Sequence, residues 1–405
     1  MLKYSIPKIK DFCIFYYALE VKKMKKLGLY IHIPFCTKKC DYCNFCSLPR
    51  IGGGDINSYF SALEEEILSY KDQIENYKVQ TVYFGGGTPS CVPEKYIERI
   101  VTVLAETFRF SLKDPTLEKT IEVNPESASL KKLQTYINLG INRLSMGLQA
   151  TQDRLLKGIG RTHTIDGFLK AYDHAIQAGF DNISVDLMMG LPEQTIEDVG
   201  ESVEFVTQLD KIQHISAYSL KIEDDTILEK KERAGLLVLP SEEEERQMAY
   251  LMESGLRSKG FNQYEISNFA KPNQESRHNS AYWDLSDYIG LGLGASSYFQ
   301  DRRFSNFFGM EAYCSALEKG ESAILEDHLL DQMEKMGDWM FLGLRRTKGV
   351  SDREFQQMFG KSFFVVYKKE IEKLVNLDLI WKKEDRIGLT RRGLDLANQV
   401  FMEFV

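Results

Sequence analysis

The feature that most constrains the fold is a regular alternation of two kinds of segment between residues 27 and 220. Short apolar segments, rich in β-branched residues, occupy 27–35, 79–84, 119–124, 142–149, 182–188 and 214–220. Amphipathic helical patterns lie between them, at 56–76, 93–108, 129–138, 165–178 and 196–209. This order predicts parallel strands covered by helices, either in an open doubly wound sheet or in a barrel.

A barrel is favoured because the chemically distinctive motifs follow the ends of the predicted strands. In a barrel these positions gather on one face. We therefore expect an α/β fold with a partial (β/α)6, TIM-like barrel as its main body. The sequence does not determine whether the sheet closes.

The alternation stops after Pro240, which predicts further parts of the chain. A charged helix is expected at 241–259, followed by a stretch rich in aromatic residues, glycine and serine. From about Leu329 the pattern is three helices, a hairpin and a final helix, an order typical of a small winged-helix module. We predict four parts: an extension (1–26), a core barrel (27–240), a barrel extension (241–328) and a C-terminal domain (329–405).

Charge and hydropathy exclude some classes of function. The 405 residues are 43% hydrophobic, enough for a large core, and carry a net charge of −8. Nucleic-acid binding needs a concentrated basic surface, so we expect no nucleic-acid partner and a packing role for the C-terminal domain. No apolar run could span a bilayer. The first 26 residues lack a signal-peptide cleavage pattern, and Met24 is an alternative start, so we expect a cytoplasmic protein.

Three cysteines form the most informative motif. Cys36, Cys40 and Cys43 stand in "CTKKCDYCNF" with C-x3-C-x2-C spacing. Soft thiolates in one loop select an iron–sulfur cluster or zinc, and structural zinc sites prefer four ligands. Three thiolates leave one iron open for another ligand. Cys46 is a fourth candidate, disfavoured because the chain would have to fold back tightly, whereas Cys13, Cys91 and Cys314 are expected to be structural.

The segment "GLYIHIPFCTKKCDYCNF" resembles the radical S-adenosylmethionine (SAM) superfamily. It is most similar to the oxygen-independent coproporphyrinogen III oxidase group and its heme-chaperone branch, the HemW family. The similarity runs from about Leu27 to the C-terminus. It implies a radical SAM barrel, a [4Fe–4S] cluster on Cys36, Cys40 and Cys43, and SAM on the open iron, with Tyr42 against the adenine.

A glycine run follows the second predicted strand in "TVYFGGGTPS". Glycines without Cβ atoms let the backbone approach a ligand closely, and the Gly-Lys-Ser/Thr ending of a phosphate loop is absent. The resemblance implies that this run receives the amino group of SAM. The other SAM-site residues that it implies lie on successive units, and the full set is Tyr30, Tyr42, Gly86, Gly87, Thr88, Glu122, Gln149, Arg161 and Asp186.

The segment "RHNSAYW" matches the HNxxYW signature of the heme-chaperone family. An imidazole can ligate heme iron, so we expect His278 to bind heme, with Tyr282 and Trp283 offering flat apolar faces. The alternative is a hydrogen-bonded histidine beside two core aromatic residues. This chain departs from the family at Ser296, where relatives usually have histidine, so heme binding could differ here.

Two functions remain in competition. Heme binding and delivery is favoured, because true decarboxylases of the group carry a cysteine at the position of Phe45 and a longer N-terminal region. The main alternative is oxidative decarboxylation of coproporphyrinogen III. A radical SAM methyltransferase, a heme-degrading enzyme and a structural iron–sulfur protein are less favoured. We expect heme, a heme-acceptor protein such as a membrane-associated respiratory enzyme, and a cluster reductant as partners; a homodimer, enzymatic activity and any catalytic residue stay open.

Overall fold

The computed structural model describes residues 24–49 and 53–405. The predicted extension, residues 1–26, falls almost entirely outside the described residues, as does Cys13. In the part of the chain that is described, no helix combines the length and apolarity needed to cross a membrane.

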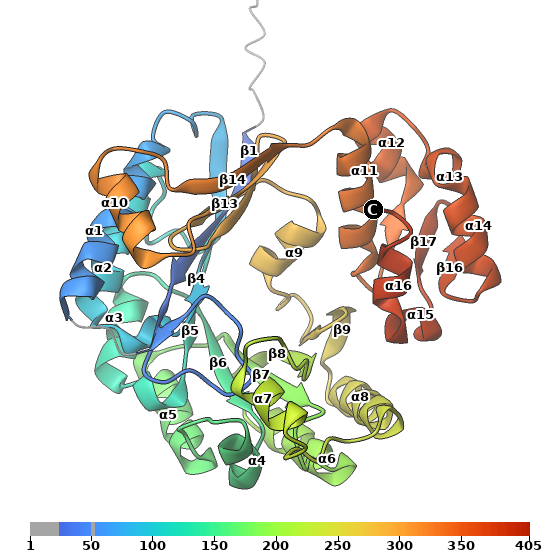
Figure 1. The fold of residues 1–405 in the computed structure, drawn as a ribbon, viewed down its shortest axis with the longest axis horizontal. Coiled ribbons are helices and arrows are strands. Elements are labelled where there is room, and N and C mark those ends of the chain that lie inside the picture. The colour runs from blue at the N-terminus through green and yellow to red at the C-terminus, as the bar shows by residue number, and fades with distance from the viewer. Residues whose placement is uncertain (1–23, 50–52) are drawn as a thin grey trace, which may run out of the picture.

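A twelve-stranded sheet forms the centre of the molecule (Figure 1). Seven neighbouring strands run parallel, in the order β11-β1-β4-β5-β6-β7-β8. Six of them are the predicted strands: β1 (Lys25–Ile33), β4 (Tyr77–Gly86), β5 (Glu118–Val123), β6 (Arg143–Gln149), β7 (Ile183–Met189) and β8 (Ile212–Ser219). The curved sheet keeps two separate edges in the described residues, so the expected partial barrel is confirmed.

Helices cover the outer face of the parallel strands and keep their apolar residues buried. They are α1 (Gly53–Ser69), α2 (Glu94–Thr107), α3 (Leu130–Asn138), α5 (Ile165–Ala178) and α6 (Ile196–Thr207). Thr195 begins α6 with a reciprocal capping box to Asp198. The predicted helix 56–76 is wrong at its end, because residues after Ser69 form turns. Tyr70 and Ile74 are still buried there, which preserves the apolar spacing without a helix.

The sheet continues at both edges with strands that the sequence did not predict. Strands β9 (Asn262–Glu265) and β10 (Asn268–Ala270) run antiparallel beyond β8. Strands β12 (Ser296–Phe299), β13 (Arg302–Asn306) and β14 (Ile324–Leu329) extend the sheet beyond β11 (Tyr288–Leu291). These strands are short and interrupted by turns, so their periodicity is weak. The helices of this part and the short helices of the barrel are α4 (Asp153–Gly158), α7 (Ile227–Arg233), α8 (Glu242–Ser258), α9 (Arg277–Trp283) and α10 (Met310–Glu318).

The C-terminal domain has its own core and the predicted element order. Its helices precede and follow a three-stranded sheet, β15-β17-β16. The elements are α11 (Gln332–Leu344), β15 (Val350–Ser351), α12 (Asp352–Phe359), α13 (Phe363–Val366), α14 (Lys368–Asn376), β16 (Ile380–Lys383), β17 (Arg386–Leu389), α15 (Arg391–Asp395) and α16 (Ala397–Phe401).

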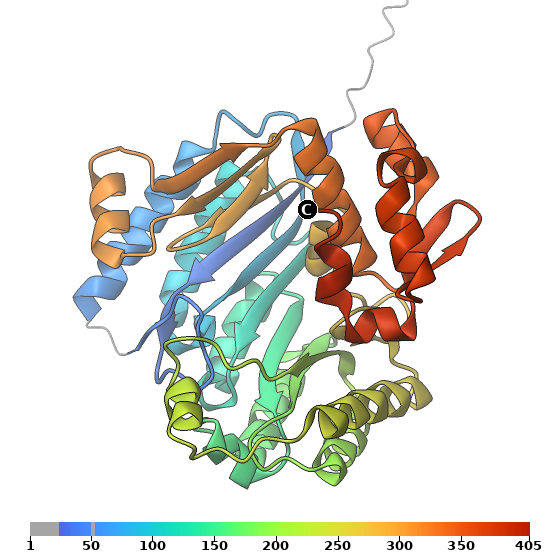
Figure 2. The same ribbon diagram turned by 45° about the vertical axis from the view of Figure 1, so that its right-hand side comes forward.

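Helix α9 lies between the sheet and the C-terminal domain, where both views show it (Figures 1 and 2). Arg346 forms an ion pair with Asp284, directly after α9. Leu285 packs against the C-terminal core. The HNxxYW segment therefore forms a helix that lies between the sheet and the C-terminal domain.

Two very short strands clasp the cysteine loop. β2 (Phe35–Cys36) pairs in parallel with β3 (Leu48–Pro49). The amide of Thr88, just before the 3-10 turn Pro89–Cys91, donates to the carbonyl of Phe35 at 2.7 Å. A second 3-10 turn, Pro125–Ser127, follows β5. These contacts place the cysteine loop over the C-terminal ends of the strands.

Candidate cofactor-binding site

The three predicted cluster cysteines lie around one cavity of about 460 Å³. Cys36 Sγ is 3.6 Å from the hydroxyl of Thr88, and the Arg161 guanidinium donates to Cys40 Sγ, also at 3.6 Å. Burial raises the pKa of the Cys36 and Cys43 thiols, and neighbouring thiols add to the effect. Iron ligation would offset this by stabilising the thiolates.

Asp41 fixes the middle of the cysteine loop. Its amide donates to the carbonyl of Ile159 at 3.0 Å, and its own carbonyl accepts from the amide of Leu228 at 2.9 Å. Its carboxylate pairs with Lys231 at 2.6 Å. The loop is thus anchored to α7 and to the segment after α4 before any cofactor is bound.

Cys46 lies apart from these three cysteines. It lines a different cavity, and its Sγ approaches only the carbonyl oxygen of Phe308, at 3.9 Å, within the part of the chain that is described. No three His, Cys, Asp or Glu side chains in residues 24–49 and 53–405 converge on a single metal ion. A cubane does not require such convergence, because each thiolate binds a different iron.

The glycine run is required by packing against the protein itself. Gly86 has a φ of +111°, and a Cβ there would lie 2.5 Å from the His32 ring. A Cβ on Gly87 would lie 2.6 Å from the carbonyl oxygen of Phe35. The sequence interpretation relied on close approach to a ligand. The structure adds that these glycines let the strand end pass under the cysteine loop, where they also line the cavity.

Two carboxyl groups, Glu122 and Asp186, face the same cavity from β5 and β7. Glu122 accepts from the Tyr83 hydroxyl at 2.8 Å and from the Gly86 amide at 3.3 Å. Burial raises the pKa of Glu122 to about 7 and that of Asp186 to about 6; the charge of Asp186 adds to the shift at Glu122. A cationic ligand would stabilise both ionised forms, which suits a sulfonium and an ammonium group.

Arg161 lines the same cavity and supplies positive charge. It donates to the side-chain oxygen of Asn124 at 2.9 Å and to the carbonyl of Gly147 at 2.8 Å. Its Nε is buried without a hydrogen-bond partner among the described residues. An unmatched buried donor beside Cys40 fits an anionic group in the cavity, such as a carboxylate or the charged cluster.

Gln149 completes this side of the cavity at the end of β6. It is 8% exposed and has a φ of +73°, a left-handed conformation unusual for glutamine. A Cβ on Gly147 would lie 2.9 Å from its side-chain nitrogen. Of the nine predicted SAM-site residues, eight line this cavity: Tyr42, Gly86, Gly87, Thr88, Glu122, Gln149, Arg161 and Asp186.

Tyr30 is the predicted SAM-site residue that the structure places elsewhere. Its hydroxyl lies 3.0 Å from His32 Nδ1, and its ring stacks on Tyr83 at 6.2 Å. It lines the neighbouring aromatic cavity. Tyr30 therefore does not line the cavity that the eight other predicted residues share.

Several residues of the SAM cavity were missed by the sequence interpretation. Asn124 donates to Thr88 at 3.0 Å and accepts from Arg161. Ser145 donates to Asp186 at 3.4 Å. Asn124 directly follows β5, a usable signal, but polar residues at such positions are common turn and cap residues, and Ser145 lies within β6.

His278 is enclosed within the protein. It is 2% exposed, and its ring stacks on Tyr83 at 5.0 Å. Its Nδ1 lies 2.8 Å from the Thr81 hydroxyl, and its Nε2 lies 2.7 Å from the Tyr282 hydroxyl. Burial lowers the pKa of His278 to about 3, so the ring is neutral. Both ring nitrogens are thus already engaged in this structure.

An aromatic cavity of about 710 Å³ lies beside the SAM cavity. Tyr282 and Trp283 form one part of its lining, and Ser296 lies at its β12 side. The guanidinium of Arg345 stacks on Trp283 at 4.5 Å. Asn44 and Phe45 belong to both cavities. The segment after the third cysteine therefore separates a polar cavity from an aromatic one.

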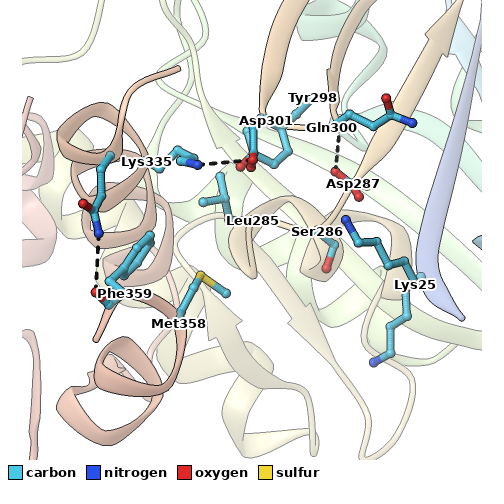
Figure 3. Close-up of a pocket in the computed structure, with 12 residues that line it drawn as sticks. Lys25, Leu285, Ser286, Asp287, Tyr298, Gln300, Asp301, Lys335, Met358 and Phe359 are labelled. Atoms are coloured by element: carbon cyan, nitrogen blue, oxygen red, sulfur yellow. Dashed lines mark hydrogen bonds and ion pairs between the residues drawn. The ribbon is translucent and has the colours of Figure 1, made fainter. Parts of the chain in front are cut away.

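A third cavity, of about 570 Å³, continues from the aromatic one toward the start of β1 (Figure 3). The two share Leu285, Ser286 and Tyr298. Lys335 reaches across from α11 to Asp301 at 3.2 Å. This cavity carries none of the predicted site residues.

Comparisons with known proteins agree with the fold. The radical SAM superfamily model matches residues 30–206, and the HemN C-terminal domain model matches residues 330–396. Coproporphyrinogen III oxidase (HemN) from Escherichia coli superposes with a TM-score of 0.82 at 23% identity, over 94% of this chain and 90% of that chain. The fold and the cysteine-lined cavity therefore define a radical SAM protein, a class that carries a [4Fe–4S] cluster and SAM.

Full-length relatives narrow the assignment. Heme chaperone HemW from Lactococcus lactis is 37% identical over 94% of this chain and 98% of its own length. Heme chaperone HemW from Bacillus subtilis is 35% identical over 93% of this chain and 98% of its own length. A mitochondrial radical SAM domain-containing protein 1 from Mus musculus is 31% identical over 93% of this chain. The chain belongs to the HemW family, as the sequence resemblance predicted.

Proposed function

We propose that this protein binds heme and delivers it to heme proteins, and that its radical SAM cavity supports this role. The observation that carries the proposal is the position of the HNxxYW helix, α9. Its Tyr282 and Trp283 line an aromatic cavity that shares Asn44 and Phe45 with the cluster cavity. The names of the full-length relatives support heme as the ligand.

Each cavity suits one ligand. Cys36, Cys40 and Cys43 would hold the [4Fe–4S] cluster, and Glu122, Asp186 and Arg161 would orient SAM through opposite charges. When bound, the cluster and SAM supply one-electron radical chemistry. Aromatic faces in the second cavity would bind the porphyrin plane by apolar contact and stacking.

The shared residues support a link between the two ligands. Phe45 is 65% exposed, so its ring is free to cover either cavity. Tyr83 contacts Glu122 through its hydroxyl and His278 through its ring. A change at the SAM cavity therefore has a direct contact route to the heme segment.

Incubation of the anaerobically reconstituted protein with hemin, and separately with coproporphyrinogen III, tests the proposal. We expect a stable heme complex that transfers heme to an apoprotein acceptor, with no consumption of coproporphyrinogen. The decarboxylase would instead convert coproporphyrinogen III to protoporphyrinogen and form no stable heme complex. That result would replace the chaperone function with the alternative.

A further inference from the structure

The structure raises the question of which protein atom binds the heme iron. We propose that Cys46 supplies the axial ligand to heme in the aromatic cavity, and that His278 acts as a positioning residue for Tyr282. This inference rests on the proposed function, because it takes heme as the occupant of that cavity.

Neither histidine near the cavity presents a free nitrogen. His278 bonds Thr81 through one ring nitrogen and Tyr282 through the other, and it is 2% exposed. His32, 6% exposed, lies with Nε2 2.7 Å from the Cys46 carbonyl oxygen and with Nδ1 3.0 Å from the Tyr30 hydroxyl. Ligation through either ring nitrogen would displace the hydrogen bond that this nitrogen makes in the structure.

The phenols of the cavity are poorer ligands than a thiol. Heme iron in proteins is held by histidine, cysteine, methionine or tyrosine, and no methionine occurs among the described residues of this lining. The hydroxyls of Tyr30 and Tyr282 are bound to His32 and His278. Burial raises the pKa of Tyr288 and of Tyr298, and also that of Cys46, but a phenol starts from a higher ordinary pKa than a thiol.

Cys46 is partly exposed at the cavity, and ligation would break no strong contact of its thiol. Its Sγ approaches the Phe308 carbonyl oxygen at 3.9 Å, a distance typical of a weak interaction. A thiol binding ferric heme releases its proton to water as the sulfur–iron bond forms. The step needs no electron donor.

The surroundings of Cys46 fit a flat apolar ligand. Phe45 and Phe308 line the same cavity and are 65% and 56% exposed. Large aromatic side chains left open to solvent mark surfaces that a ligand can cover. Arg303, which also lines the cavity, pairs with Asp338 at 3.4 Å and could exchange this partner for a heme propionate. A porphyrin here would contact Trp283 and lie next to the cluster loop.

The test compares hemin binding by the holoprotein and four variants: Cys46→Ser, Cys46→His, Cys314→Ser and His278→Ala. Cys314 is 8% exposed on α10 and contacts Met310, so it serves as a matched thiol control. The readouts are the ferric heme spin-resonance spectrum, with the cluster oxidised, and the Soret band of the ferrous carbonyl complex. Iron and sulfide content checks the cluster in every variant.

We expect a thiolate signature in the wild type and in Cys314→Ser, its loss in Cys46→Ser, and an imidazole signature in Cys46→His. Heme affinity of Cys46→Ser should fall on the order of tenfold, because the aromatic walls remain. In His278→Ala, the thiolate signature should persist with weaker binding, because Tyr282 loses its hydrogen-bond partner.

Four results would overturn the inference. A thiolate signature that survives in Cys46→Ser excludes this ligand, and a histidine signature that disappears in His278→Ala assigns the role to that residue. Loss of cluster iron in Cys46→Ser would make Cys46 a cluster ligand. A wild type that binds no heme would overturn the proposed function together with this inference, whereas the first three outcomes leave heme binding intact.

Discussion

The SAM cavity and the aromatic cavity differ in chemistry although Asn44 and Phe45 border both. The SAM cavity is lined by Glu122, Asp186 and Arg161, which are half-buried and form no direct ion pair with one another. The aromatic cavity holds mainly ring systems with few charges. A polar site that keeps unmatched charges is organised for a charged ligand, whereas an open aromatic site is organised for a flat apolar one.

The two cavities also have different origins in the fold. The SAM cavity is built at the C-terminal ends of β4 to β7, so consecutive β/α units each contribute to it. The aromatic cavity combines the cysteine loop, α9, β12, β13 and α11. It therefore depends on how the C-terminal domain packs on the sheet. If this comparison is correct, a variant in one cavity should weaken binding of its own ligand far more than binding of the other.

Cys43→Ala should have the largest effect, because a three-thiolate cluster cannot keep its geometry on two ligands. We expect loss of the cluster's absorbance and of most bound iron, together with heme binding that persists in the aromatic cavity. Cys314→Ala, the buried control on α10, should keep the cluster. Full retention of the cluster in Cys43→Ala would contradict the ligand set.

Arg161→Ala should weaken SAM binding by about 10- to 100-fold, the range for hydrogen bonds that involve a charged group. Titration calorimetry under anaerobic conditions measures this change. Arg154→Ala removes a half-exposed arginine paired with Asp198 and should leave SAM affinity unchanged. Equal losses of SAM and heme affinity in Arg161→Ala would show that the two cavities do not act separately.

Trp283→Ala should lower heme affinity by about tenfold, because a half-buried aromatic face is lost from the cavity wall. SAM affinity should stay the same. Trp381→Ala, in β16 of the C-terminal domain, removes a tryptophan outside the cavity lining and is the matched control. Thermal unfolding of both variants separates a binding defect from a loss of stability.

A smaller effect is expected from pH. The pKa of Glu122 is raised to about 7 and that of Asp186 to about 6. Above these values both groups are ionised and attract the cationic parts of SAM; below them they are neutral, so SAM affinity should fall severalfold between about pH 8 and about pH 6. Glu122→Gln should flatten this dependence. An affinity that rises on acidification would contradict the assigned sign.

Much of the fold follows from local sequence patterns. The six predicted strands and most of the helices rest on periodicity and on capping residues such as Thr195. The strands added at the sheet edges could not be predicted, because segments as short as Asn268–Ala270 acquire their structure from a neighbouring strand. The predicted end of the first helix was wrong because Tyr70 and Ile74, which are buried in turns, keep the apolar spacing of a helix.

The candidate site shows the same division between what local sequence predicts and what only long-range contacts determine. The sequence alone predicted the donor set of the cluster loop, since three thiolates at this spacing carry their chemistry in their side chains. It also predicted eight SAM-site residues on successive β/α units, whose strand ends meet at one edge of any parallel sheet. The HNxxYW motif predicted which segment takes part in heme binding. It did not predict which way the side chains of α9 point.

Only the tertiary structure decided which polar atoms already have hydrogen-bond partners within the protein and which remain accessible to a ligand. It enclosed His278 between Thr81 and Tyr282, moved Tyr30 to the second cavity and left Cys46 there with a weak contact. These outcomes depend on contacts between residues far apart in the chain, such as Thr81 with His278. A sequence determines which groups are available for chemistry, but long-range packing determines which of them remain unpaired and accessible to a ligand.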